Sequence, residues 1–255
     1  RLALHLSRSL IQAIQSLPEK SRVEAANVLV AQLFEKIAAD TGAAIDADAP
    51  SVTDEYLAAI RRKNAVGDWI EFEQPYTPLL DTTLLTNAPN EPRVGSQLIR
   101  EIDSADRIDI IMAFVRKSGL NPFIDALTKH TDRGGSLRLL TTTYTGSTEQ
   151  RALEMLETLG GEVRVSYDLS SSRLHAKAWI FHRDTGFSTA FVGSSNMTHS
   201  AHYDGLEWNL RLSGVRNPDA YRKMVSMFES YWHGGDFRHF VAEEFASYLP
   251  KSSSG

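Results

Sequence analysis

The sequence predicts an α/β fold: a mixed β-sheet flanked by helices, with an N-terminal helical region in front of it. Two patterns support this prediction. From residue 93 onward, short apolar runs alternate with amphipathic helical segments, which is typical of a parallel or mixed sheet covered by helices. Residues 2–65 show only helical spacing and no strand pattern. With 255 residues, 42% of them hydrophobic, the chain is long enough for one large domain or a domain with an appendage.

The N-terminal region is predicted to form consecutive helices. Apolar residues from Ala26 to Ile37 recur at helical spacing, and Pro18 stands where a helix can begin. Residues 41–50 indicate a loop before a third helix, whose basic residues 61–63 suit either a solvated helix end or a nucleic-acid contact. Residues 69–92 hold four of the nine prolines and indicate a linker. We therefore divide the chain into an N-terminal helical region, 1–75, and a sheet-forming domain, 76–250.

The elements of the second part follow one another in the order expected for such a sheet. Helices are predicted over residues 93–105, 121–131 and 147–159, and strands over 107–115, 136–142 and 162–167. Two further strand-like runs, 174–182 and 187–192, are joined by Asp184-Thr185-Gly186, which has the residue types of a tight hairpin. A last strand is predicted over 206–212, and two helices over 219–248.

Composition excludes several classes of protein. The chain has no cysteine, which rules out disulfides, thiolate catalysis and cysteine-ligated zinc, and we expect a cytoplasmic protein. No apolar run is long enough to span a bilayer. Because the chain starts at Arg1 and ends in Lys-Ser-Ser-Ser-Gly, we expect it to be a piece of a longer polypeptide.

The formal charge of -5 argues against a uniformly basic nucleic-acid binder but leaves room for a local basic cleft. Each basic side chain taken alone is more simply explained as scattered surface charge. The candidates for such a cleft are Arg116, Lys117, Arg173, Lys177, Arg183 and Arg211.

One set of polar residues is predicted to form a site that binds and attacks a phosphate group. His175 and Lys177 are two residues apart, so in an extended strand both side chains lie on one face. The alternating residues Leu174, Ala176 and Ala178 are then expected to point into a core. They are followed by Gly193-Ser194-Ser195-Asn196 and by Glu207 on the polar face of a strand. A neutral imidazole can attack phosphorus, while an ammonium and a carboxamide hold phosphate oxygens. A carboxylate can hold the other ring nitrogen and orient the imidazole.

Taken singly, these residues have simpler explanations. His175 would be a partly buried histidine, Lys177 a surface lysine, and Glu207 an exposed strand residue. Thr142, at a strand end, suits a phosphate pocket and a helix cap equally well. The loop residues His199, His202 and Asp204 lack a recognised metal-ligand spacing. Both Trp208 and Trp232 are predicted to lie in the core.

In combination, these motifs resemble the phospholipase D superfamily, whose pattern is His-x-Lys, an aspartate, then Gly-Ser-x-Asn. Residues 81–237 are similar to the phospholipase-D-like domain at the front of certain bacterial superfamily II helicases. The segments that carry this likeness are 84–87, 140–144, 173–177, 181–190 and 205–209. The chain has no Gly-x-x-x-x-Gly-Lys-Ser/Thr loop, so a helicase domain would lie beyond residue 255 of the same longer polypeptide.

The resemblance implies a metal-independent phosphodiesterase with a phospholipase-D-like sheet. His175 would form a phosphohistidine, Lys177 and Asn196 would bind phosphate oxygens, and Glu207 would orient a histidine. The substrate-binding residues would be Ser194, Ser195, Arg173 and Thr142. No metal and no cofactor are implied. Superfamily sites pair two motifs, so a chain with one copy would form a homodimer that shares one active site, with the partner's His175 as general acid.

The chain departs from the motif at one position, since His182 stands where the aspartate is expected. We therefore weigh three hypotheses. The first is a nuclease, with DNA as the expected substrate. The second is a non-catalytic module that binds nucleic-acid phosphates for a helicase. The third, hydrolysis of a lipid phosphodiester, has less support because the sequence shows no interfacial amphipathic or polybasic element.

Overall fold

The structure is a computed structural model that describes residues 13–14, 16–41, 74–88, 92–144, 146–168, 174–198 and 207–248. The chain separates into two compact units, residues 1–56 and 57–255. In the first unit, helix α2 (Glu19–Thr41) begins directly after Pro18, as predicted. The third N-terminal helix, with its basic residues 61–63, falls outside the described residues. The boundary between residues 75 and 76 stays a prediction.

The second unit is built on one mixed sheet, which confirms the predicted fold class. Its eight strands run in the order β1-β7-β6-β5-β2-β3-β4-β8 over the described residues. Strands β2, β3 and β4 pair in parallel, and the other neighbours pair antiparallel. The strands are β1 (Thr83–Leu85), β2 (Arg107–Met112), β3 (Ser136–Thr142), β4 (Glu162–Ser166), β5 (Lys177–His182), β6 (Thr189–Gly193), β7 (Asn209–Ser213) and β8 (Arg238–His239).

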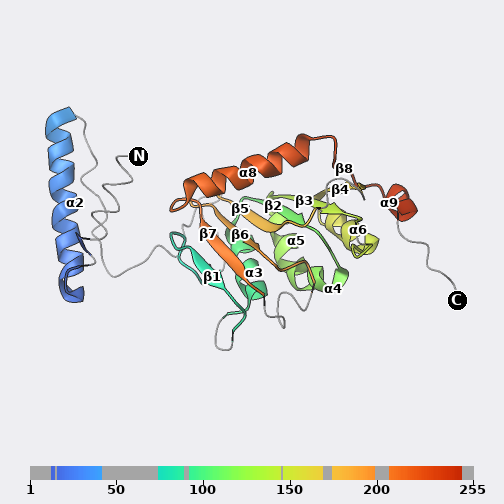
Figure 1. Ribbon diagram of the computed structural model, residues 1–255, viewed down its shortest axis with the longest axis horizontal. Coiled ribbons are helices and arrows are strands. Elements are labelled where there is room, and N and C mark those ends of the chain that lie inside the picture. Colours follow the sequence, from blue (N-terminus) through green and yellow to red (C-terminus); the bar gives the residue numbers. More distant parts are fainter. Residues whose placement is uncertain are drawn as a thin grey trace. The chain divides into compact units, whose positions relative to one another are not determined.

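Helices cover both faces of this sheet (Figure 1). Helix α8 (Pro218–His233) lies along one face. The other face carries α3 (Val94–Ser104), α4 (Lys117–Leu120), the 3-10 turn η1 (Asn121–Phe123), α5 (Ile124–Asp132) and α6 (Gln150–Thr158), while α9 (Ala242–Tyr248) lies near the β8 edge. No helix among the described residues is long and apolar enough to cross a membrane.

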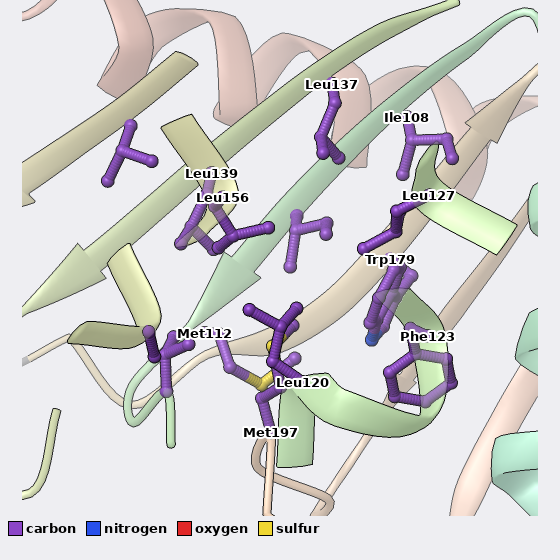
Figure 2. Close-up of a cluster of buried hydrophobic side chains, with 14 of the residues drawn as sticks. Ile108, Met112, Leu120, Phe123, Leu127, Leu137, Leu139, Leu156, Trp179 and Met197 are labelled. Carbon is purple, nitrogen blue, oxygen red and sulfur yellow. The ribbon is translucent and has the colours of Figure 1, made fainter. Parts of the chain in front are cut away.

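Each face of the sheet has its own apolar core because side chains alternate along the strands. Trp179 and Phe181 of β5 enter the larger core, together with Ile108, Leu127 and Leu139 from neighbouring elements (Figure 2). Ala178 and Ile180 point the other way, toward Phe228 and Trp232 of α8. Strand β5 is thus buried on both faces, and only its first residue and the segment before it are placed to carry a site.

The structure corrects part of the predicted linker. Residues 83–85 form β1, an edge strand paired with β7. The short strand β8 was also not predicted. It lies between α8 and α9 in the sequence and pairs with β4. The predicted hairpin is present, because β5 and β6 pair antiparallel and Gly186 has a φ of 83° in the turn. A positive φ is one that glycine adopts readily.

The strands next to the predicted catalytic segments all have one terminus at the same edge of the sheet. Strands β2 and β3 end there at Met112 and Thr142, β6 ends at Gly193, and β5 and β7 begin at Lys177 and Asn209. We call this the site edge, because it is where the predicted catalytic segments meet.

Candidate active site

His175 and Lys177 meet at the site edge. His175 lies two residues before the first residue of β5 and is exposed, whereas Lys177 is only 7% exposed. The Lys177 ammonium lies 2.9 Å from Nδ1 of His175 and donates to the His175 carbonyl oxygen at 2.7 Å. The predicted shared orientation is therefore realised as direct contact, although Ala176 between them is exposed rather than buried in a core.

Glu207 and Ser194 form a second pair beside the first. The Ser194 hydroxyl donates to the Glu207 carboxylate. The backbone also joins these segments, since Ser194 N–H donates to the Trp208 carbonyl at 3.1 Å and Trp208 N–H donates to the Ser194 hydroxyl at 3.2 Å. Glu207 is thus held by the Gly-Ser-x-Asn segment, and no hydrogen bond joins it to His175 among the described residues.

Asn196 is oriented by the segment that follows β2. Its side-chain oxygen accepts a hydrogen bond from Phe114 N–H at 3.2 Å. The Phe114 ring also lies edge-on to the His175 ring, with centroids 6.4 Å apart. Because the oxygen accepts this backbone hydrogen bond, the amide nitrogen is the side-chain atom of Asn196 that can act as a donor.

Lys177 is the member of the first pair that is shielded from water. Burial lowers the pKa of the Lys177 ammonium below its ordinary value, and the negative charge of Glu207 opposes this shift. Lys177 also lines a small cavity with Ser195 and Asn209. The Asn209 amide donates to the Ser195 hydroxyl at 2.7 Å, and this hydrogen bond fixes the two side chains that line the cavity together with Lys177. Ser195 is thus buried in the wall behind Lys177, whereas Ser194 is exposed.

Of the other two predicted substrate-binding residues, Thr142 is engaged by its own neighbours and Arg173 is not described. Thr142 ends β3 at the site edge, but its hydroxyl donates to the Ser166 carbonyl at 3.1 Å and accepts from Tyr144 N–H at 3.1 Å. Arg173 falls outside the described residues, as do His199, His202 and Asp204. The binding roles of Thr142 and Arg173 stay predictions.

Two candidates for the basic cleft are in fact buried structural ion pairs. Arg183 and Arg211 both bind the carboxylate of Glu101, a residue of α3 that is 1% exposed. Burial works against ionisation of Glu101, yet the two guanidinium groups and Thr189 outweigh it and lower the pKa of the carboxyl. These two arginines are therefore not available to a substrate, which corrects that part of the prediction.

His182, which replaces the motif aspartate, lies away from the site edge. It ends β5 on the face toward α8, where its Nε2 lies 2.7 Å from Asp109 and its Nδ1 lies 2.9 Å from the Tyr221 hydroxyl. Asp109 is fully buried and also binds Arg138 through two hydrogen bonds of 2.7 and 2.9 Å. His182 is five residue steps along β5 from Lys177, which corresponds to about 17 Å of strand.

The sequence patterns missed three features of the site. Asn209 could have been found, because it alternates with Glu207 across Trp208 and so shares the face of Glu207. Phe114 gave no signal, since its contacts join residues far apart in sequence. Trp208 was predicted to lie in the core, but its side chain is 67% exposed, whereas Trp232 is buried as predicted.

Comparisons with known proteins identify the family. Residues 98–232, more than half of the chain, match the model of the family described as cardiolipin synthase, phospholipase-D-like domain. The chain therefore belongs to this family of phospholipase-D-like domains, which confirms the resemblance to the phospholipase D superfamily, while the likeness to a helicase-associated domain stays a prediction. No significant match was found among curated proteins.

Solved structures include several similar chains. The phospholipase D family member Nuc from Salmonella typhimurium is 18% identical, with a TM-score of 0.49 over 63% of this chain and 99% of its own. NucT from Helicobacter pylori is 16% identical, with a TM-score of 0.48 and the same coverage. A phosphatidylserine synthase from Haemophilus influenzae is 11% identical, with a TM-score of 0.45 over 64% of this chain and 40% of its own.

Proposed function

We propose that this domain is a metal-independent phosphodiesterase that acts on nucleic acid, with DNA as the expected substrate. The observation that carries the proposal is the meeting of His175, Lys177, Ser194, Asn196 and Glu207 at one edge of the sheet in a phospholipase-D-like domain. An imidazole supplies a nucleophile, and the ammonium and carboxamide supply the charge and donors that a phosphoryl group requires.

The mechanism begins when a phosphate enters the site. Its negative charge would attract the Lys177 ammonium, which in the structure donates toward Nδ1 of His175. Once Lys177 turns to the phosphate oxygens, the imidazole can exchange its proton with water from Nε2 to Nδ1. Nδ1–H then donates a hydrogen bond to a carboxylate, and Nε2 is the unprotonated nitrogen. Glu207 is the nearby acid suited to this role after release of Ser194. His175 then attacks phosphorus, so that the N–P bond of a phosphohistidine forms while the bond from phosphorus to the leaving oxygen breaks, and that oxygen takes a proton. Water then attacks the phosphohistidine, which releases the phosphate and restores His175.

The proton for the leaving oxygen is assigned to a second copy of the chain. Each chain carries a single His-x-Lys motif, so a homodimer that joins two site edges would bring the partner's His175 to the opposite side of the phosphate. The larger polypeptide is proposed to carry a helicase domain, on the strength of the motif resemblance alone.

The proposal is tested by incubating the purified chain with single-stranded and duplex DNA in excess EDTA. We expect cleavage to persist in EDTA and to fall by at least about 1000-fold in His175→Ala, since removal of a nucleophile commonly has effects of this order. A Lys129→Ala variant, changed on the far edge of the sheet, is the matched control and should cleave as the wild type does. Cleavage that EDTA abolishes, or that His175→Ala retains, would refute the mechanism.

One observation favours a second function, a non-catalytic module that binds nucleic-acid phosphates for a helicase. In the structure Glu207 bonds to Ser194, and Lys177 rather than a carboxylate is the neighbour of Nδ1 of His175. This arrangement suits anion binding as it stands but needs rearrangement before attack. If the wild type and His175→Ala bind DNA equally and neither cleaves DNA or RNA, this second function is the correct one.

A further inference from the structure

The segment that follows β2, residues 114–117, is fastened to the Gly-Ser-x-Asn segment. Besides the bond from Phe114 N–H to the Asn196 side chain, Met197 N–H donates to the Phe114 carbonyl at 3.2 Å and Arg116 N–H donates to the Met197 carbonyl at 3.0 Å. Val115 and Met197 form a parallel bridge. Whatever residues 114–117 present to solvent is therefore held at a fixed position beside Asn196.

The second side of this segment is held by the loop before α6. Glu149 N–H donates to the Val115 carbonyl at 2.9 Å, and Lys117 N–H donates to the Glu149 carboxylate at 2.8 Å. Met197 itself is fully buried in the larger core beside Leu120 of α4 (Figure 2). The segment is thus a braced shelf at the site edge, which we call the 114–117 shelf.

Two cations stand exposed on this shelf without side-chain partners. Arg116 and Lys117 are both exposed, and within the described part of the chain neither side chain forms an ion pair or a hydrogen bond. By contrast, Arg183 and Arg211 are both paired with Glu101. Because the backbone that carries these two cations is already fixed, only their side chains lose entropy on binding an anion, and no internal ion pair must be broken first.

We propose that Arg116 and Lys117 bind the backbone phosphates of a nucleic-acid strand next to the phosphodiester held at His175 and Asn196. This inference rests on the proposed function and narrows its substrate to a polymer with successive phosphates. The shelf lies directly beside Asn196, so a strand with one phosphate in the site passes its next phosphates over the two cations. A diester without neighbouring phosphates would gain nothing from them.

The salt dependence of binding separates phosphate contacts from other effects. Removing one cation that neutralises a phosphate reduces the slope of log K against log salt by about 0.9 for duplex DNA and about 0.7 for a single strand. The test compares Arg116→Ala/Lys117→Ala with Lys129→Ala/Arg216→Ala. The control pair removes the same charge from two exposed residues, on α5 and after β7, at the edge of the sheet opposite the site.

Both pairs are made in the His175→Ala chain, so that labelled oligonucleotides stay intact while anisotropy is measured between about 50 and 200 mM salt. We expect the shelf pair to lower the slope by about 1.8 on duplex DNA or about 1.4 on a single strand, and the control pair to leave it unchanged. In chains that retain His175, hydrolysis of bis(p-nitrophenyl) phosphate should be equal for the shelf pair and the wild type, since this small diester has no neighbouring phosphates.

Each result decides the proposal separately from the nuclease assignment. A lower slope for the shelf pair supports it even if the wild type cleaves nothing. Equal slopes for both pairs, or no binding of nucleic acid by the His175→Ala chain without either pair, overturn it even if the small diester is hydrolysed. It is also overturned if the shelf pair leaves the DNA slope unchanged but weakens binding to vesicles of phosphatidylcholine and phosphatidylglycerol, because the shelf would then bind a lipid surface.

Discussion

At the scale of single residues, the presence of His182 is explained by its neighbour on the next strand. Asp109 is fully buried, and burial alone would favour its neutral form. Hydrogen bonds from His182 and Arg138 outweigh this cost and keep the pKa of the Asp109 carboxyl below its ordinary value. An aspartate at position 182 would place a second carboxylate against the first, which is unfavourable in a buried site. The histidine at position 182, where the motif has an aspartate, therefore suits the buried negative charge of Asp109.

The contact between His182 and Asp109 predicts that an aspartate at position 182, as in the motif, makes the protein less stable. His182→Asp should lower the free energy of unfolding by about 2 to 3 kcal/mol at pH 7, since it replaces a charge-assisted hydrogen bond with repulsion. His182→Asn, which keeps a donor toward Asp109, should cost less. Urea unfolding of both variants measures the difference. The idea fails if His182→Asp is as stable as the wild type.

The hydrolysis rate of the folded variant is the control for this stability experiment. Because about 17 Å of strand separates position 182 from Lys177, folded His182→Asn should hydrolyse bis(p-nitrophenyl) phosphate at the wild-type rate, if the wild type is active. A selective loss of turnover in a stable His182→Asn chain would instead give position 182 a role in the site.

The residue scale also shows the limit of sequence patterns. Strand alternation and the order of the motifs predicted that Lys177, Asn196 and Glu207 belong to one site, and in the structure their segments meet at the site edge. They could not show that Lys177 contacts His175 while Glu207 contacts Ser194, because such pairings depend on side-chain rotamers and on neighbours from other segments. Likewise, nothing in the sequence around Arg183 or Arg211 indicated that both would be neutralised by Glu101, a distant residue of α3.

At the scale of elements, the position of Asn196 depends on how closely α4 approaches the Gly-Ser-x-Asn segment. Gly119 of α4 lies so close that a β-carbon built on it would collide with the Met197 carbonyl oxygen and with Thr198 N. Both of these are backbone atoms, which cannot turn aside as a side-chain end would. The glycine therefore sets the spacing between α4 and the residues that follow Asn196.

Gly119→Ala should consequently move these backbones apart. We expect a loss of about 1 to 3 kcal/mol in the free energy of unfolding, as for other overpacked sites, and weaker phosphate binding because Asn196 is displaced. Gly235→Ala is the matched control, since a β-carbon there meets no atom within 4 Å. Urea unfolding and binding of a labelled oligonucleotide measure the two effects. Equal behaviour of the two variants would show that α4 does not position the site.

The elements that sequence patterns predicted well are the long periodic ones. Strands β2, β3 and β4 and the helices between them were located because each buries an apolar run of its own. Strand β1 was missed because its three residues lie among prolines and its pairing with β7 is the only source of its strand geometry. The exposure of Trp208 was missed for a related reason, since an alternating strand does not show which of its faces is covered by a helix.

At the scale of the whole molecule, α8 leaves part of its sheet face uncovered. Leu84, Leu210, Val192 and Ala178 are cross-strand partners in one row over β1, β7, β6 and β5. The first three are 46%, 37% and 41% exposed. The row continues into an apolar groove of about 390 Å³ between the sheet and α8, and Ala176, the neighbour of His175, lines this groove. A contiguous exposed apolar surface of this kind marks an interaction site.

A second copy of the chain is the partner that suits this surface. The residues of this surface are mostly apolar, so it offers a nucleic acid few charges to bind, whereas the same apolar surface of a second chain could be buried against it. The surface also borders the site edge, so a dimer formed through it could bring two His175 side chains toward one phosphate. We therefore predict that the homodimer of the proposed mechanism uses this row.

Val192→Asp/Leu210→Asp tests this prediction, because burying two unpaired carboxylates in an interface is costly while both positions are open to water in the single chain. The dimer dissociation constant, measured by sedimentation, should rise by at least about 100-fold, which corresponds to about 2.7 kcal/mol. DNA cleavage should fall in parallel, with the circular dichroism spectrum unchanged. Val241→Asp, at a residue that is 46% exposed beside β8, should leave both the dimer and cleavage intact. A Val192→Asp/Leu210→Asp chain that remains dimeric would place the interface elsewhere, and a monomer that still cleaves would remove the partner's His175 from the mechanism.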